Sequence, residues 1–268
     1  MNGIDISSWQ KNLIVSNLHD DTEFIIVKAT GGNGYMNPYF SHHMEQSITH
    51  QKLVGAYHYA REKGYKGTPA SEAEHFLNAV GAYINKAILA LDWEEELSLG
   101  PDWALQWLDY VYNKTGVKPL LYTSQSVCSS YDWYSVATRG YKLWLAQYAN
   151  TKPTEYQGTP WRKGSIGAFN TPIIHQYSGT GVIAGYTGSV DLNKFYGTAN
   201  DWKQLATGGS VQSTEQKEEL SDDMKWAIEM GLFVGDGNGN YFPKEPLTRE
   251  HAASVLHRFI ERRSNDTI

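Results

Sequence analysis

The sequence predicts an α/β fold: an irregular (β/α)8-like barrel followed by a small, mainly helical C-terminal domain. Eight short apolar runs recur within the first 198 residues, helix-like or loop segments separate them, and polar or aromatic residues close most of the runs. Apolar runs without polar alternation are typical of parallel strands, because such strands are covered on both faces. Eight of them with intervening helices predict a barrel.

The expected strands, in order, are residues 3–6, 24–28, 53–58, 87–92, 119–122, 143–148, 173–177 and 190–192. Helices are expected at residues 71–80 and 102–113, between two pairs of these runs. Residues 150–171 are rich in Gly, Pro and Thr and are expected to form a loop. The second half of the barrel is therefore expected to be the irregular one.

The chain changes character at about residue 199, where Gly, Ser, Thr and other polar residues become frequent. The predicted division is a first domain at 1–198, a linker at 199–219 and a second domain at 220–268. In the second domain, Ser221 caps an expected helix that ends near Gly231, and Thr248 opens another. About 50 residues are few for an independent fold, so this domain is expected to need a partner surface.

Composition and charge exclude several classes of function. The 268 residues are 41% hydrophobic and 19% charged, which is typical of a folded protein, and the formal net charge is -6. Nucleic acid is not an expected partner, because phosphate binding needs a concentrated basic face. No apolar stretch is long enough to cross a membrane. The aromatic content of 13% fits a bulky core or a sugar-binding groove equally well.

Residue types that bind metals or cofactors show no functional spacing. The single cysteine, Cys128, has no activating neighbour in the sequence and is expected to be buried and inert. The glycine-rich residues 31–34 lack the pattern of a phosphate loop, and no Gly-x-Ser-x-Gly elbow is present. No metal or cofactor is therefore expected, and hydrogen-bonded or solvated roles are expected for His42, His43, His58, His75 and His175.

Polar side chains gather at the ends of the predicted strands. In a β/α barrel, the carboxyl ends of the strands meet on one face, where active sites are built. The side chains expected to converge there are Asp5, Lys28, Tyr57, Asp92, Glu94, Tyr122, Gln147, Gln176 and Asp191.

The pair Asp92 and Glu94 has the composition of an acid–base site for glycoside cleavage. That chemistry needs one protonated carboxyl group at the leaving oxygen and one ionised group at the oxocarbenium-like centre. Residues two apart on a strand face the same side, and two nearby carboxylates raise one pKa. The longer Glu94 is the expected acid, and Trp93 is expected to point away. Ion pairing at a barrel rim is the alternative for these two residues, and Asp5 and Asp191 at other strand ends favour the functional interpretation.

Taken together, the motifs resemble glycoside hydrolase family 25, the bacterial and phage N-acetylmuramidases. The matching segments occur in the family's order across residues 1–197. They are 3–10 (GIDISSWQ), 24–30 (FIIVKAT), 55–60 (GAYHYA), 91–94 (LDWE), 121–124 (LYTS), 143–148 (LWLAQY), 175–178 (HQYS) and 190–193 (VDLN).

The resemblance implies a flattened barrel that cleaves the β-1,4 bond from N-acetylmuramic acid to N-acetylglucosamine. It implies Glu94 as general acid/base and Asp92 as second carboxylate, either a nucleophile or the stabiliser of an intermediate formed with the substrate's acetamido group. Asp5 and Asp191 match the family's other cleft carboxylates. The substrate-binding residues expected with them are Tyr57, Tyr122, Gln176 and Lys28. The sequence departs from the family at Gly31, where an acidic residue is frequent, and this departure removes one implied substrate contact.

The second domain resembles a surface-layer-homology repeat, which implies binding to a secondary cell-wall polymer. The matching residues lie at 226–228, 231–232, 235–237, 242–243, 247–249 and 258–259. Such repeats usually act in groups of three, so self-association of this domain is expected. A calcium loop at 236–247 is rejected, because Tyr241 replaces the required Gly and Leu247 the bidentate Glu.

Two other functions stay open on the sequence. A chitinase-like or endo-N-acetylglucosaminidase barrel also ends a strand in Asp-x-Glu, but it normally has a further Asp where this chain has Ala90. A non-catalytic wall-binding protein is disfavoured by the presence of both Asp92 and Glu94. The N-terminal residues contain no basic-then-apolar leader. The expected location is therefore the cytoplasm of a phage-infected bacterium and then its wall, as for an endolysin, with a host autolysin of unusual export as the alternative.

Overall fold

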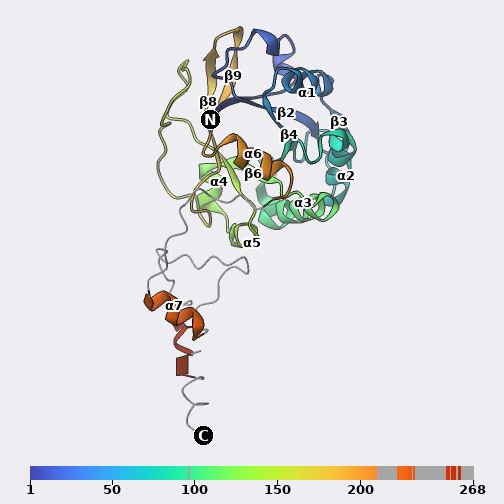
Figure 1. Ribbon diagram of the computed structural model, residues 1–268. Coiled ribbons are helices and arrows are strands. Elements are labelled where there is room, and N and C mark those ends of the chain that lie inside the picture. Colours follow the sequence, from blue (N-terminus) through green and yellow to red (C-terminus); the bar gives the residue numbers. More distant parts are fainter. Residues whose placement is uncertain are drawn as a thin grey trace. The chain divides into compact units, whose positions relative to one another are not determined.

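The computed structural model describes residues 1–95, 97–209, 222–230, 232, 252–253, 255–257 and 259–260. The chain divides into two compact units, Met1–Ser213 and Thr214–Ile268. In the first unit, strands form a closed ring with helices outside it (Figure 1). The predicted α/β barrel is confirmed.

The first unit contains nine described strands. They are β1 Asn2–Ile6, β2 Phe24–Gly31, β3 Tyr35–Met36, β4 Leu53–Tyr59, β5 Ile88–Asp92, β6 Leu120–Ser124, β7 Leu143–Ala146, β8 Ile174–Ile183 and β9 Tyr186–Phe195. Their order in the sheet is β1-β9-β8-β7-β6-β5-β4-β2-β3, and pairing of β1 with β2 closes an eight-stranded barrel. The short β3, which the sequence did not predict, forms a hairpin on β2.

The barrel is regular except where β9 enters it. Neighbouring strands are parallel from β1 through β2 and β4 to β8, whereas β9 is antiparallel to both β8 and β1. A hairpin therefore replaces the last crossover helix of a regular barrel. The predicted irregularity of the second half is confirmed.

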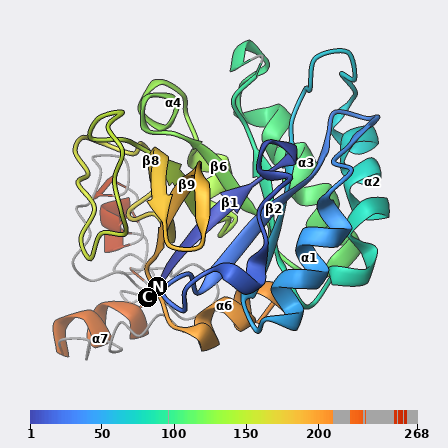
Figure 2. The same cartoon turned by 90° about the horizontal axis from the view of Figure 1, so that it is seen from above.

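Six described helices accompany the strands of the first unit: α1 Phe40–Thr49, α2 Pro69–Val80, α3 Gly100–Thr115, α4 Gln125–Ser130, α5 Tyr134–Thr138 and α6 Ala199–Ala206. Short 3-10 turns lie at Ser8–Gln10, Val15–Asn17, Gly81–Tyr83 and Leu97–Leu99. Figure 2 shows α1, α2 and α3 on one side of the barrel and the long loop between β7 and β8 on the side of β8 and β9. Both predicted helices and the predicted loop are thus present.

Local sequence explains where the two longest helices begin and end. Thr68 and Ser71 form a capping box around the start of α2, with Pro69 in its first turn. The helix α3 also has a proline in its first turn and ends at Gly116, whose φ of 71° is left-handed and suits glycine.

Alternation along the strands divides the apolar side chains into two layers. On β2, Ile25 and Val27 pack outward under the helices, whereas Phe24 and Ile26 fill the barrel interior. The interior layer is closed at the end where β2 begins by Trp202 of α6, whose ring lies 4.6 Å from that of Phe24. The interior is therefore a packed core, open to function only at its other end.

The predicted linker is wrong over its first residues. Residues 199–206 form α6, which is capped by Thr198 and buries Trp202, and the indole Nε1 donates to the carbonyl oxygen of Val54 at 3.1 Å. The Thr-x-x-Asp cap and the tryptophan were the sequence signals for a docked helix. Residues 207–209 follow α6 as a turn, and the rest of the predicted linker, residues 210–219, lies outside the described residues.

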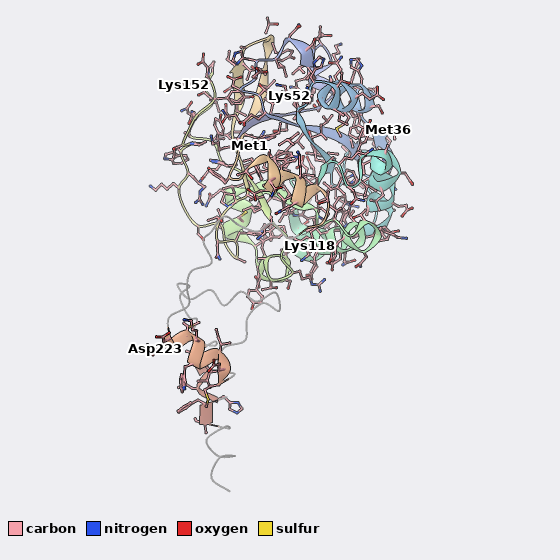
Figure 3. All side chains as sticks on the ribbon, in the orientation of Figure 1. Met1, Met36, Lys52, Lys118, Lys152 and Asp223 are labelled. Carbon is pink, nitrogen blue, oxygen red and sulfur yellow. The ribbon has the colours of Figure 1, made fainter. Side chains whose placement is uncertain are left out.

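In the second unit, α7 spans Asp222–Glu229, where the first helix of the C-terminal domain was predicted. The described residues between 252 and 260 are also helical. Figure 3 shows Asp223 on α7, and Met36 and Lys152 at the outer edges of the first unit. Among the described residues, no helix has the length and apolar character needed to cross a membrane.

Candidate active site

Four carboxyl side chains meet at the open end of the barrel. Asp5 is the penultimate residue of β1 and lies directly opposite Asp191 on β9. Asp92 is the last residue of β5, and Glu94 follows two residues later. Besides burial, the charges of Asp5 and Glu94 raise the pKa of both Asp92 and Asp191, so the four carboxyl groups form one cluster. The structure thus brings together the carboxylates predicted from the strand ends.

The chain stays extended beyond β5, which puts Asp92 and Glu94 on the same side. The amide of Trp93 donates to the Tyr122 carbonyl oxygen at 2.9 Å, and the Thr123 hydroxyl donates to the Trp93 carbonyl oxygen at 2.8 Å. Trp93 points away from the site and stacks on Trp103 with 5.1 Å between ring centroids. Alternation then leaves both carboxyl groups facing the barrel opening, as predicted.

Asp92 and Glu94 form a pair of carboxyl groups that raise or lower one another's pKa. Asp92 is buried at 6% exposure, and its Oδ1 has no hydrogen-bond partner among the described residues, whereas the Glu94 side chain is exposed. Loss of water, and then the Glu94 charge, raise the pKa of Asp92 well above its ordinary value. Loss of water also raises the pKa of Glu94, while the interaction with Asp92 opposes that rise. The pair therefore holds a proton to higher pH than an exposed carboxyl group does.

Asp5 and Asp191 form a second pair. Burial raises the pKa of Asp5 to about 6, although the side-chain amides of Gln176 and Asn193 donate to its Oδ2 at 2.8 and 2.7 Å and lower it. Loss of water and the Asp5 charge raise the pKa of Asp191 to about 8. At neutral pH, Asp191 is thus largely protonated and Asp5 ionised.

Gln176 is held beneath the carboxyl groups by a chain of buried polar contacts. Its Oε1 accepts from the hydroxyl groups of Tyr122, at 2.7 Å, and Tyr148. Asn193 is fixed in the same way, because its Oδ1 accepts from Trp144 Nε1 at 2.8 Å. Tyr122 and Gln176, predicted to line the groove, are buried and orient Asp5. Sequence reasoning missed Tyr148 and Asn193, although both lie in the motifs that follow strand runs.

Tyr57 and Lys28 lie on the other side of the cluster. The pKa of Tyr57 is raised well above its ordinary value by burial and by the charges of all four carboxyl groups, so its side chain faces the same end of the barrel. Lys28 donates to Glu62 Oε2 at 2.7 Å and lies 4.3 Å from the ring centroid of Tyr59. Glu62 and Tyr59 were not predicted as site residues, because both lie beyond the end of the expected strand 53–58.

Other residues singled out in the sequence have structural roles. The Gln147 amide binds the backbone of Lys163 in the long loop, so it does not join the cluster. His58 is fully buried between the Thr30 hydroxyl and the Glu72 carboxylate. Burial raises the pKa of the Cys128 thiol to about 12, which keeps it unreactive. Among the described residues, no group of three or more His, Cys, Asp or Glu is arranged to hold a metal.

Comparison with known proteins identifies the family. The model of glycosyl hydrolases family 25 matches residues 4–186, and that of the S-layer homology domain matches residues 216–253. Lysozyme M1 of Streptomyces globisporus is 28% identical over 214 residues, covering 74% of this chain and 68% of its own. The N,O-diacetylmuramidase of Chalaropsis sp is 28% identical over 228 residues, covering 77% and 99%.

A solved structure agrees with these relatives. The family GH25 lysozyme from Aspergillus fumigatus aligns with a TM-score of 0.61 at 25% identity, over 77% of this chain and 99% of its own. Asp5, Asp92 and Glu94 all fall within the span that the family model matches, whereas Asp191 lies just beyond it. With most of the barrel matched, the chain belongs to glycosyl hydrolases family 25 and carries an S-layer homology domain at its C-terminal end.

Proposed function

We propose that this glycoside hydrolase is a muramidase that cleaves the β-1,4 bond between N-acetylmuramic acid and N-acetylglucosamine in peptidoglycan. The observation that carries the proposal is the pair Asp92 and Glu94 at the open end of the barrel, one carboxyl group buried and the other exposed, both with raised pKa values. Glycoside cleavage needs one carboxyl proton and one carboxylate at the scissile bond, and a pair that holds a proton to higher pH can supply both. The muramidases among the relatives support this substrate.

In the proposed reaction, the proton that Asp92 holds passes to Glu94, which delivers it to the leaving oxygen. Its side chain is exposed and reaches a glycan, whereas Asp92 is buried below it. When the proton leaves, Asp92 remains as the anion with an unpaired Oδ1. That anion either attacks the anomeric carbon or stabilises an intermediate formed by the substrate's own acetamido group. In the second half of the reaction, Glu94 takes a proton from the attacking water.

Asp5, Asp191 and Tyr57 are the proposed surroundings of the sugar at the scissile bond. The ionised Asp5, held by Gln176, stabilises positive charge that develops on the sugar ring, and the protonated Asp191 donates a hydrogen bond to a sugar hydroxyl. The four neighbouring carboxyl groups cannot all ionise beside a neutral sugar. The positive charge of the transition state favours their ionised forms, so the site binds the transition state more strongly than the resting sugar.

Trp9 is the proposed outer wall of the glycan groove. It follows Asp5 by four residues in the 3-10 turn after β1, and its indole is 88% exposed. The turn is fixed by a capping box of Ser7 and Gln10, and Gln10 also reaches the carbonyl oxygen of Ser189 on β9. An exposed indole carried by this fixed turn presents a flat apolar face to a pyranose ring.

The S-layer homology domain is the proposed anchor to a secondary wall polymer. Its pairing with a muramidase fits a wall-associated lytic enzyme, an endolysin or an autolysin. The expected self-association falls on residues 220–268, most of which lie outside the described residues. Light scattering of the full-length protein tests it, and a strictly monomeric particle would contradict it.

The new reducing ends in a digest of purified peptidoglycan test the proposed bond specificity. Muramic acid at the new ends is the expected result. Glucosamine at those ends would mean that the chain is instead an endo-N-acetylglucosaminidase. No release by a correctly folded protein would mean that the chain only binds the wall.

A further inference from the structure

The last residue of β2, Gly31, has no side chain, and a side chain from another part of the chain fills the space beside it. Gly31 is buried three residues after Lys28, and its φ is not left-handed. A Cβ atom placed on Gly31 would lie 2.6 Å from Oε2 and 2.9 Å from Cβ of Glu62. The Glu62 side chain, from the loop between β4 and α2, therefore occupies the volume that a side chain at position 31 would take.

Glu62 and the two aromatic rings hold the Lys28 ammonium in one place. Its Nζ donates to Glu62 Oε2 at 2.7 Å, and the two side chains are only 14% and 25% exposed. The ammonium also lies 4.3 Å from the ring centroid of Tyr59 and 5.1 Å from that of Tyr35. A partly desolvated cation bound by one carboxylate and two aromatic faces has little freedom to move.

The Lys28 charge acts on the catalytic pair. Its position lowers the pKa of both Asp92 and Glu94 against the raising effect of burial. The other ionisable groups around it are the hydroxyls of Tyr35 and Tyr59, the Glu95 carboxylate that accepts from Tyr59 at 3.0 Å, and His58. Burial lowers the pKa of His58, so that ring is neutral and Lys28 is the cation that faces the pair.

We propose that Glu62 is a positioning residue for the reaction: it fills the space above Gly31 and holds the Lys28 ammonium beside Asp92 and Glu94. Glu62 touches neither the pair nor the sugar in this role, and it acts only through Lys28. The consequence for catalysis rests on the proposed muramidase function, whereas the electrostatic coupling does not.

Four variants of the full chain test the coupling by carbon-detected NMR titration of the Asp92 and Glu94 carboxyl groups, with peptidoglycan cleavage against pH measured in parallel. Lys28→Met removes the cation, so both carboxyl groups are expected to titrate about 1 pH unit higher. Glu62→Ala releases the cation and is expected to shift them in the same direction. Because the acid loses its proton at higher pH, the basic limb of the activity profile moves to higher pH as well.

The double variant separates positioning from a general structural effect. Glu62→Ala combined with Lys28→Met is expected to titrate like Lys28→Met alone, since Glu62 has nothing left to position. Additive shifts would overturn the proposal. The swap Gly31→Glu with Glu62→Ala puts a carboxylate back into the same volume from β2, and it is expected to restore the wild-type titration and pH profile.

The swap also keeps the test decisive if Glu62→Ala fails to fold. A folded swap variant whose carboxyl groups titrate as in Lys28→Met would refute the role of Glu62, as would an unshifted titration in folded Glu62→Ala. Failure of the wild-type protein to cleave peptidoglycan would instead refute the proposed function and leave the titration result standing.

Discussion

The two ends of the barrel interior are built from the same strands but from different chemistry. Where β2 begins, Phe24, Phe195 and Trp202 pack ring against ring, and the polar atom of Trp202 is bonded to a backbone carbonyl. At the opposite end, Asp5 and Asp92 are just as enclosed, yet each meets another carboxyl group. The first end is a core of apolar rings whose one polar atom is hydrogen-bonded. The second end buries ionisable groups close to one another, which lowers the stability of the fold when they ionise.

The difference shows where this chain places stability and where it places reactivity. Buried carboxyl groups destabilise the folded state when ionised, which is why their pKa values rise. The aromatic layer and the helices offset that cost, and the carboxyl cluster in turn holds protons at a pH where exposed carboxyls have lost them. Changes at one end are therefore expected to alter activity, and changes at the other to alter the free energy of unfolding.

The largest expected effect is a loss of activity without a loss of stability, from a change at the carboxyl end. Glu94→Gln removes the proton donor but keeps the shape of the side chain, so kcat is expected to fall by about 10²- to 10⁴-fold. The melting temperature is expected to stay the same or rise, since one of the two carboxyl groups that compete for a single proton is gone. Cleavage of labelled peptidoglycan measures the loss, with Asp20→Asn, which changes a fully exposed carboxylate, as the control. Retained activity would remove Glu94 from its role.

At the aromatic end, Trp202→Ala is expected to lower the free energy of unfolding by about 3–5 kcal/mol, because it empties a fully buried site beneath the barrel. The activity per folded molecule is expected to be unchanged. Urea unfolding followed by circular dichroism measures the change. Trp161→Ala, at a half-exposed position in the long loop, is the matched control and is expected to lose about 1 kcal/mol or less. A similar loss in both variants would contradict the packing role of α6.

The pH dependence of stability sharpens the comparison at the carboxyl end. The folded-state pKa values of Asp5, about 6, and Asp191, about 8, lie above the ordinary value of 3.8. Their contribution to stability is therefore complete below about pH 4 and is lost as the pH rises toward 8. Asp191→Asn cannot ionise, so its stability is expected to fall less over this range and to exceed that of the wild type above pH 8.

Urea unfolding at pH 5 and pH 8.5 measures this slope. Asp20→Asn provides the control. The Asp20 carboxylate is fully exposed, and its ion pair with Lys52 is long, at 4.0 Å. A slope for Asp191→Asn as steep as that of the Asp20→Asn protein would show that Asp191 does not hold a proton in the folded state.

The smallest expected effect concerns the rim of the groove. Trp9→Ala removes a stacking face worth about 1 kcal/mol, so KM for peptidoglycan is expected to rise several-fold with little change in kcat. Trp161→Ala serves again as the control, because it removes an exposed indole elsewhere. Equal KM values in the two variants would exclude Trp9 from glycan binding.

The sequence predicted the features that depend on short-range patterns. Continuous apolar runs located the barrel strands, and Asp92 and Glu94 followed from their place at the end of such a run. The linker prediction failed at residues 199–206 because it relied on their polar composition. The burial of Trp202 depends on contacts with the whole barrel, which the local sequence does not show. Glu62 and Tyr148 were missed for the same reason: their contacts with Lys28 and Gln176 are long-range, and no local pattern encodes them.

The most direct test of Asp92 and Glu94 as the reaction centre is the anomeric configuration of the first-formed product, followed by proton NMR during cleavage of a soluble peptidoglycan fragment. In the proposed reaction Asp92 acts on the anomeric centre directly or through the acetamido group, and it does not activate a water on the opposite face of the sugar as an inverting reaction requires. Attack by Asp92 and assistance by the substrate's acetamido group both pass through an intermediate and regenerate the starting configuration. A β-configured product is therefore expected. An α-configured first product would require a carboxylate farther from Glu94 to activate water, and would contradict the assignment of Asp92.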